Sequence, residues 1–206
     1  MSDRYPVRAR HERFHGNVFS VVTDEVAMPD GRYVERDYAR HVGAVAVAAV
    51  DEADRIVLIR QYRHAIGTEL WELPAGLMDV AGEELAAAAA RELAEEADLS
   101  AARWQLLLDL HSSPGFSTEV VRVYLARELT EVPEAQRHER EHEEAGLTIR
   151  RVPLDEAVAM VLRGEITNAS AVAGVLAAAR LHDAGWPPPV RPLDAPLPRA
   201  PDAVDR

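Results

Sequence analysis

Residues 76–99 read GLMDVAGEELAAAAARELAEEADL, and this stretch predicts a tight loop that leads into a single helix. The five alanines at positions 86–90 have the highest intrinsic helix propensity of any residue type. Positions 86, 90, 93 and 97 are all apolar and fall on one helical face. The sequence therefore predicts a helix over residues 83–97, with Gly76 and Gly82 bracketing the loop that precedes it.

Three glutamates of this helix, Glu92, Glu95 and Glu96, are spaced so that their carboxylates lie together beside the apolar face. Like charges at this spacing weaken an isolated helix. A hard divalent cation would reverse that effect, because carboxylate oxygens are the ligands that Mg²⁺ prefers. Backbone carbonyls of the loop at Ala75 and Gly76 could complete a metal shell. The alternative is a solvated acidic helix face with no ligand.

Other apolar and β-branched stretches predict the remaining elements. The predicted strands are 19–28, 33–38, 42–50, 55–62, 104–110, 120–127 and 147–152. The further predicted helices are 154–163 and 168–182. Strands on both sides of one central helix, with helices late in the chain, indicate an α/β sandwich. Residues 1–15 are charged and are expected to be loosely ordered, and the Glu-rich segment 131–146 is expected to be a loop.

The two ends of the chain differ in composition from its middle. Residues 1–40 form a β segment in which the strands 19–28 and 33–38 make a hairpin around the turn at residues 29–31. Such a hairpin would leave an exposed edge in a monomer, so a homodimer is expected. Residues 186–206 contain repeated prolines and are expected to be a disordered or extended tail.

Composition also excludes several classes of function. The 206-residue chain has a net charge of −12 at pH 7, which repels phosphate backbones and anionic lipid, so neither nucleic acid nor membrane is expected as a partner. Cysteine is absent, which excludes disulfides and thiolate metal sites. The sequence has no apolar run of about 18 residues and no signal-peptide core, so a cytoplasmic location is expected.

The stretch 76–99 resembles the Nudix box, which reads Gly, five residues, Glu, seven residues, and then Arg-Glu-apolar-x-Glu-Glu-x-Gly-apolar. The matching residues are Glu83, Arg91, Glu92, Leu93, Glu95, Glu96 and Leu99. The sequence departs from the pattern twice, because six residues separate Gly76 from Glu83 and because Asp98 stands in place of the usual glycine. Asp tolerates the left-handed conformation better than most side chains, so the helix cap is expected to survive.

The resemblance implies a Nudix-type α/β/α sandwich with a mixed central sheet, whose catalytic domain spans 41–185. It implies a hydrolase that depends on Mg²⁺ or Mn²⁺ and acts on a nucleoside diphosphate linked to a further group. Glu92 and Glu96 would be the leading metal ligands, assisted by Glu95. Arg91 would orient the carboxylates, for instance by pairing with Glu83, or would form a surface pair with Glu95.

Residues outside the box resemble the ADP-ribose pyrophosphatase branch of actinobacterial type. In that branch a proline lies sixteen residues after the last glycine position of the box, which here is Pro114, followed by Gly115. The alternative is that Pro-Gly simply makes a turn. The wider likeness spans about residues 16–185 and includes the stretches 43–47, 61–64, 71–76 and 168–176.

This resemblance implies roles for three further side chains and a shared architecture. Arg63 would face a phosphate, Glu72 would lie near the adenosine side, and Arg36 would reach across a twofold axis. In such enzymes the N-terminal hairpin crosses to a second subunit, and the active site draws on both chains. Each of the three side chains could instead be a surface charge.

The catalytic base is expected outside the box, because the box glutamates are committed to metal. In similar enzymes a loop glutamate just before a late strand is the proposed base, and the run Glu-Glu-Ala points to Glu144, with Glu143 and then His142 as alternatives. A solvated acidic loop is the other interpretation. The implied reaction is hydrolysis of ADP-ribose to AMP and ribose 5-phosphate. Alternatives are another nucleoside diphosphate sugar, a dinucleotide, or a non-catalytic Nudix-like ligand sensor.

Overall fold

The computed structural model describes residues 5–140 and 146–198, and the chain divides into two compact units. The first unit comprises residues 1–43, 111–120 and 198–206, and the second comprises 44–110 and 121–197. The stretch 111–120 joins the first unit through backbone hydrogen bonds: Ala39 N donates to Phe116 O at 2.8 Å, and Thr118 N donates to Ala39 O at 2.9 Å.

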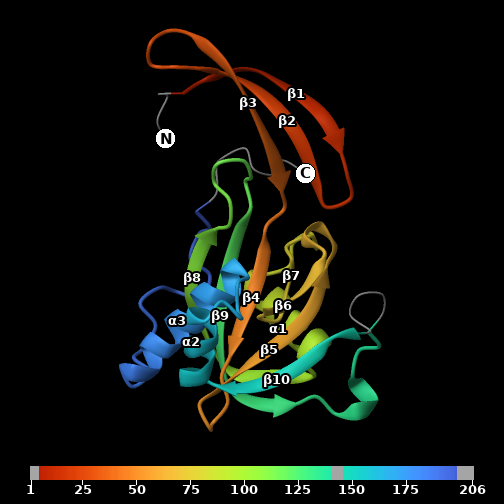
Figure 1. Cartoon of the computed structure of the whole chain (residues 1–206), viewed down its shortest axis with the longest axis vertical. Helices are drawn as coiled ribbons and strands as arrows, with labels where there is room; N and C mark the ends of the chain where they lie inside the picture. The colour runs from red at the N-terminus through yellow and green to blue at the C-terminus, as the bar shows by residue number, and fades with distance from the viewer. Residues whose placement is uncertain (1–4, 141–145, 199–206) are drawn as a thin grey trace. The chain divides into compact units, whose positions relative to one another are not determined.

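The first unit is built on a three-stranded antiparallel sheet in the order β1-β2-β3 (Figure 1). Its strands are β1 (Val7–His15), β2 (Phe19–Ala27) and β3 (Tyr33–His41). β2 and β3 pair without a bulge from Phe19 opposite His41 to Ala27 opposite Tyr33, which confirms the predicted hairpin.

The expectation that residues 1–15 are loosely ordered was wrong for β1. Apolar residues alternate with arginines only at Val7–Arg10 of this strand, and most of its side chains are exposed. It is held instead by pairing with β2 and by ion pairs, among them Arg10 Nε to Asp24 Oδ1 at 2.7 Å. Because those partners lie on another strand, no local pattern in residues 1–15 announces the strand.

The second unit contains two sheets. Its strands are β4 (Ala44–Ala49), β5 (Arg55–Arg63), β6 (Thr68–Glu72), β7 (Ala75–Leu77), β8 (Leu99–His111), β9 (Val120–Glu131) and β10 (Thr148–Pro153). One sheet has the order β7-β4-β9-β8, with β4 parallel to β9 and antiparallel to β7. The other has the order β10-β5-β6 and is antiparallel. The predicted mixed sheet is therefore confirmed.

Helices cover both faces of β4. They are α1 (Leu85–Ala97), α2 (Leu154–Leu162) and α3 (Ala169–Asp183), and α2 lies against α3 (Figure 1). Val45 and Val47 belong to the same core cluster as Leu93 of α1, whereas Ala46 and Ala48 pack with residues of α2 and α3. Such burial on both faces is typical of a central strand between helix layers. The predicted α/β/α sandwich is therefore confirmed.

The ends of α1 fix the geometry of the helix that carries the carboxylates. The helix begins at Leu85, two residues later than expected, because Glu84 is its N-cap and has an extended backbone. At the other end Asp98 adopts the left-handed conformation, with φ 54° and ψ 36°, and its N–H donates to Ala94 O. The expectation that Asp98 preserves the cap is therefore confirmed.

The C-terminal segment has no helix or strand between residues 186 and 198. The sequence predicts a disordered or extended tail; residues 187–197 contact the rest of the second unit through hydrogen bonds from Gln105, Arg122 and Tyr124. Short 3-10 turns occur at His64–Ile66 and Glu134–Gln136. In the part of the chain that the structure describes, no helix is both long and apolar enough to cross a membrane.

Candidate active site

The acidic side of α1 is organised around Arg91. Its Nη1 lies 2.6 Å from Glu92 Oε1 and 3.0 Å from Glu95 Oε2, and its Nε lies 3.1 Å from Glu83 Oε1. Both pairings that the sequence suggested, with Glu83 and with Glu95, are thus present. The hydrogen bond to Glu83 is the main reason that the pKa of Arg91 is raised, and the same bond lowers the pKa of Glu83.

The backbone of β7, the strand that precedes the loop before α1, approaches the carboxylates of Glu96 and Glu92. Glu96 is only 4% exposed, and its Oε2 accepts a hydrogen bond of 2.8 Å from Ala75 N. A Cβ atom at Gly76 would fall 2.0 Å from Glu92 Cδ, so only glycine allows the loop and the carboxylate to be this close. The structure therefore brings Glu92 and Glu96 to the backbone at Ala75 and Gly76, and it joins Glu95 to Glu92 through Arg91.

The donors in this cluster suit a hard divalent cation. The carboxylates of Glu83, Glu92, Glu95 and Glu96 and the loop backbone offer oxygen atoms, which Mg²⁺ and Mn²⁺ prefer. Within residues 5–140 and 146–198, no three acidic or histidine side chains are already arranged around a common metal position. Arg91 lies between Glu92 and Glu95, so its guanidinium provides the positive charge in this arrangement. The residues present therefore fit such a metal by donor chemistry.

Arg63 and Glu72 form a bidentate pair between the neighbouring strands β5 and β6. Arg63 Nε lies 2.8 Å from Glu72 Oε1, and Nη2 lies 2.6 Å from Oε2. The Glu72 side chain is 2% exposed, whereas that of Arg63 is 44% exposed. A buried carboxylate thus fixes the plane of an accessible guanidinium, a group whose fork geometry matches phosphate oxygens.

Arg140 is a residue that the sequence interpretation missed. Its Nε donates to the backbone oxygen of Glu95 at 3.0 Å, and its Nη2 donates to Asp98 Oδ2 at 2.7 Å. Arg140 therefore ties the chain that precedes residue 141 to the C-terminal end of α1. The sequence did offer a signal, because Asp98 adds a carboxylate where the Nudix pattern has glycine. The predicted base Glu144 and its alternatives Glu143 and His142 lie outside the described residues.

The remaining predicted substrate residues belong to the first unit. Arg36 is exposed, and its Nη1 donates to Glu35 O at 3.0 Å. Pro114 and Gly115 are exposed in a loop closed by a hydrogen bond of 2.9 Å from Ser117 N to Ser113 O. These contacts describe a surface arginine and a turn within the first unit.

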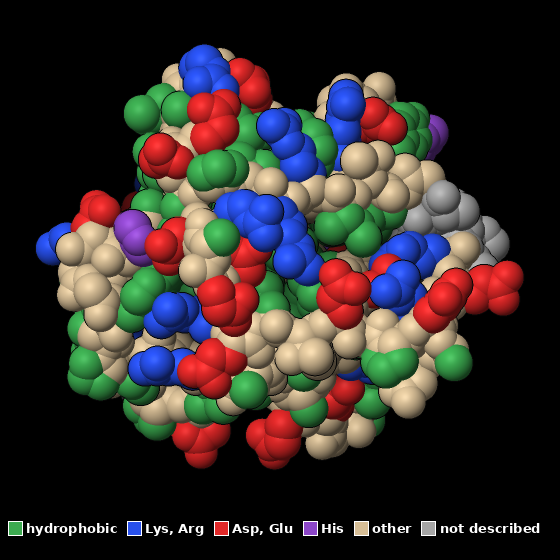
Figure 2. All heavy atoms as spheres, turned by 90° about the horizontal axis from the view of Figure 1, so that it is seen from below, with side chains coloured by type: hydrophobic (Ala, Val, Ile, Leu, Met, Phe, Trp, Pro, Cys, Tyr) green, Lys and Arg blue, Asp and Glu red, His purple; other side chains and the backbone are tan. Residues whose placement is uncertain are grey.

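Charge on the surface of the protein is mixed. On the face shown in Figure 2, acidic side chains alternate with arginines and with apolar side chains. The net charge of −12 is therefore not concentrated in one patch on this face. An anionic substrate would depend on local arginines such as Arg63.

The fold and the acidic helix are those of one class of protein, and the chain belongs to the Nudix family. The family model described as NUDIX domain matches residues 39–173. The chain is 51% identical over 179 residues to the ADP-ribose pyrophosphatase of Mycobacterium tuberculosis, which covers 87% of this chain and 84% of that protein. It is 32% identical over 161 residues to the ADP-ribose pyrophosphatase of Bacillus subtilis, covering 78% and 85% of the two chains.

A solved structure has the same fold. The crystal structure of an ADP compounds hydrolase superposes with a TM-score of 0.75 at 20% sequence identity, covering 89% of this chain and 97% of that one. At this identity the likeness concerns the fold alone.

Proposed function

We propose that this protein hydrolyses the diphosphate bond of ADP-ribose to AMP and ribose 5-phosphate, with Mg²⁺ or Mn²⁺ as cofactor. The observation that carries the proposal is the approach of Glu92 and Glu96 to the backbone of β7 at Ala75 and Gly76, with Glu95 joined to Glu92 through Arg91. The names of the two relatives support the choice of substrate.

The residues of α1 would hold the cation, and the loop would complete its shell. Glu92 and Glu96 would be the leading ligands, with Glu95 and a backbone oxygen of the loop at Ala75 or Gly76 beside them. A bound divalent cation would polarise a phosphoryl oxygen of the substrate and acidify a nearby water. Arg91, which contacts Glu92 and Glu95, would keep these carboxylates oriented toward one side of the helix.

Arg63 would bind the diphosphate of the substrate. Its guanidinium is held on one side by buried Glu72, so less side-chain entropy is lost when it donates to a phosphate oxygen. Glu72 would then act mainly by holding Arg63 in place, in addition to its proposed position near the adenosine side of the substrate. Arg36, Pro114 and Gly115 remain proposed substrate residues on the strength of the family pattern.

Glu144 is the proposed general base. Arg140 is tied to the backbone of Glu95 and to Asp98, at the C-terminal end of the metal helix. Glu144 follows Arg140 by four residues in the sequence. Glu144→Gln is expected to lower kcat by about 10²–10⁴-fold with little change in metal affinity. A kcat within a few-fold of wild type would move the role to Glu143.

The direct test is release of AMP from ADP-ribose with Mg²⁺, with Mn²⁺ and with a chelator. A guanosine diphosphate sugar and a dinucleotide, assayed in parallel, separate the proposed substrate from other members of its class. Tight binding of ADP-ribose with no product under any metal condition would indicate a ligand sensor instead. Hydrolysis in ¹⁸O-water with mass analysis of both products identifies the phosphorus that is attacked.

We also propose that the protein is a homodimer whose first unit mediates association. Phe14, Phe19 and Tyr33 on the β1-β2-β3 sheet are each more than two-fifths exposed. Apolar side chains on a sheet with free edges favour pairing with a second copy. Sedimentation at micromolar concentration should give a species of about 45 kDa, twice the chain mass of 22.7 kDa. A fully active monomer would contradict this proposal and the role of Arg36.

A further inference from the structure

The C-terminal segment 187–197 is attached to the rest of the second unit by side chains of β8 and β9, which donate hydrogen bonds to the backbone of the segment. Arg122 on β9 donates from Nη1 to Ala195 O at 2.6 Å and from Nη2 to Pro196 O at 3.3 Å. Gln105 on β8 donates from Nε2 to Pro187 O at 3.2 Å. Because these bonds use backbone oxygens, they hold a segment that has no regular secondary structure of its own.

The anchor is a buried charge cluster. The side chains of Arg122 and Asp109 are 1% and 4% exposed, and Arg122 Nε lies 2.7 Å from Asp109 Oδ1. Arg191, from the segment itself, places Nη2 2.7 Å from Asp109 Oδ2. Burial alone would raise the pKa of Asp109, but the hydrogen bonds from both arginines outweigh it and hold that pKa below its ordinary value. The segment is therefore held from its own side as well as from the sheet.

The anchored segment reaches the helix that carries the carboxylates. Ala195 is 8% exposed and belongs to the same core cluster as Ala88, Ala89 and Leu93 of α1. No other described residue of the segment is in that cluster. Ala195 is therefore the residue through which the segment joins the core cluster that includes α1.

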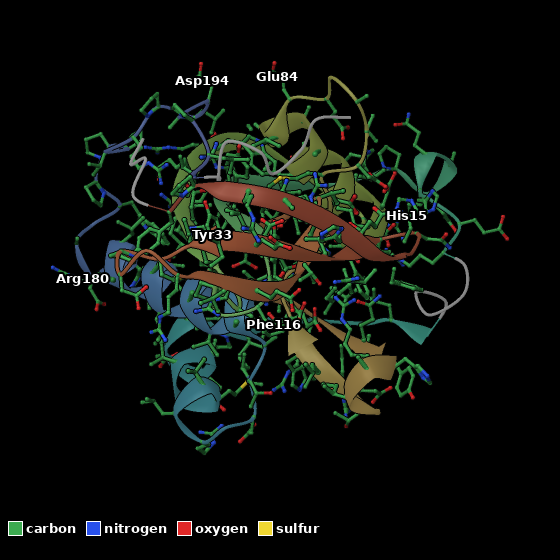
Figure 3. All side chains as sticks on the ribbon, turned by 90° about the horizontal axis from the view of Figure 1, so that it is seen from above. His15, Tyr33, Glu84, Phe116, Arg180 and Asp194 are labelled. Atoms are coloured by element: carbon green, nitrogen blue, oxygen red, sulfur yellow. The ribbon has the colours of Figure 1, made fainter. Side chains whose placement is uncertain are left out.

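Beside this contact, the packing between the segment and the helix is open. A cavity of about 430 Å³ is lined on one side by Leu85 and Ala86 and on the other by Leu193 and Leu197. Glu84 and Asp194 also line it, and Figure 3 shows both pointing outward from the ribbon. Ala195 lines the same cavity, so the segment and the first turn of α1 face each other across it.

We propose that residues 187–197 form a positioning strap for the metal-binding helix. Arg122 and Asp109 hold this strap in place, and Ala195 determines the position of α1. Glu92 and Glu96 are thereby held against the backbone at Ala75 and Gly76. Small displacements at a reacting centre have large effects, and partners behind metal ligands commonly change metal affinity by about 10–100-fold. The metal-binding part of this inference rests on the proposed function, and the packing part does not.

The test compares two variants that carry the same new charge on the strap. Ala195→Asp puts a carboxylate into the buried cluster that includes α1, whereas Val190→Asp puts it on a side chain that is 96% exposed. Ala195→Asp should weaken Mn²⁺ binding, measured by electron paramagnetic resonance, by about tenfold. It should also raise hydrogen exchange of the buried Ala88 and Ala89 amides by about tenfold, the ratio that 1.4 kcal/mol produces. Val190→Asp should change neither by more than about twofold.

Two further measurements keep the outcomes apart. If Ala195→Asp does not fold, Arg191→Met decides, because Arg122 still pairs with Asp109 in that variant while the strap loses its own anchor. It should raise exchange at Ala88 and Ala89 in the same direction. Unchanged exchange and unchanged Mn²⁺ binding in a folded Ala195→Asp or Arg191→Met protein would overturn the strap. Failure of the wild-type protein to bind Mn²⁺ would overturn the proposed function while the exchange measurement still tests the strap.

Discussion

Arg91 on α1 and Arg122 on β9 both hold carboxylates by short contacts, but the balance of charge around them is opposite. Arg91 contacts Glu83, Glu92 and Glu95, so negative charge exceeds positive charge there. At the other cluster, Arg122 and Arg191 share the single carboxylate of Asp109, and backbone oxygens accept the further hydrogen bonds of Arg122. An excess of carboxylates that is only partly neutralised favours a cation, whereas a cluster whose groups are all satisfied stabilises the fold.

The largest expected effect on stability comes from removing the buried guanidinium. Arg122→Met should lower the free energy of unfolding by about 3–5 kcal/mol, because the oxygens of Ala195 and Pro196 lose their donor and Asp109 keeps only its contact with Arg191. Urea denaturation measures this change. Arg191→Met is the matched control, since Arg191 is 39% exposed, and it should cost less than about 1 kcal/mol. Equal losses of unfolding free energy in Arg122→Met and Arg191→Met would show that the burial of Arg122 does not make its ion pair more important for stability.

The largest expected effect on activity comes from the cluster with excess charge. Glu96→Gln keeps an acceptor for Ala75 N but removes a charge from the proposed metal shell, so turnover with Mg²⁺ should fall by about 10²-fold, a loss of about 2.7 kcal/mol. Stability should change little in comparison with Arg122→Met. Glu84→Gln removes the same charge from the exposed N-cap of α1 and should leave turnover near wild type. Unchanged turnover of Glu96→Gln at saturating Mg²⁺ would remove Glu96 from the metal site.

A smaller effect separates the two arginines by their response to Mg²⁺. Arg91→Met should lower stability by about 1 kcal/mol, because partly exposed ion pairs contribute little. That deficit should shrink as Mg²⁺ is added, since a cation replaces the lost positive charge and binds the variant more tightly than it binds wild type. The deficit of Arg122→Met should stay constant over the same titration. A constant deficit in both variants would mean that Arg91 does not share its carboxylates with a metal.

The smallest predicted effect is a difference in acid sensitivity. The pKa of Asp109 is below its ordinary value of about 3.9, so its stabilising contribution is present above that pH and is lost as pH falls through the value in the folded protein. The stability gap between wild type and Asp109→Asn should therefore narrow below about pH 4. The pKa of Glu83 is lowered too, but that ion pair is screened by solvent, so Glu83→Gln should show a weaker dependence. A gap for Asp109→Asn that is independent of pH would contradict this assignment.

The features that could be predicted from the sequence are those encoded by neighbouring residues. The helix α1, its cap at Asp98, the hairpin of β2 and β3, and the grouping of Glu92 with Glu96 all follow from spacings within one segment. β1 could not be predicted, because its stabilising partners such as Asp24 lie on another strand.

Arg122, Arg140 and the strap were missed for a related reason. Their hydrogen bonds end on the backbone oxygens of Ala195, Pro196 and Glu95, and a backbone acceptor leaves no side-chain signature in the sequence. A segment rich in proline also has no periodicity from which its docking could be inferred. Contacts of this kind become visible only when the chain is folded.

The contact between Gly76 and Glu92 determines where the loop before α1 tolerates a change of length. A side chain at position 76 would overlap the carboxylate of Glu92, so the beginning of the loop is fixed in both residue type and distance. Asp79 and Val80 are exposed, so the middle of the loop meets few steric limits, whereas Gly82 has a φ of 78° that favours glycine. Inserting a residue into an exposed loop costs little loop-closure entropy. The additional residue relative to the Nudix pattern is therefore accommodated after Gly76, and a library of insertions should be accepted at 79–81 and rejected at 75–76.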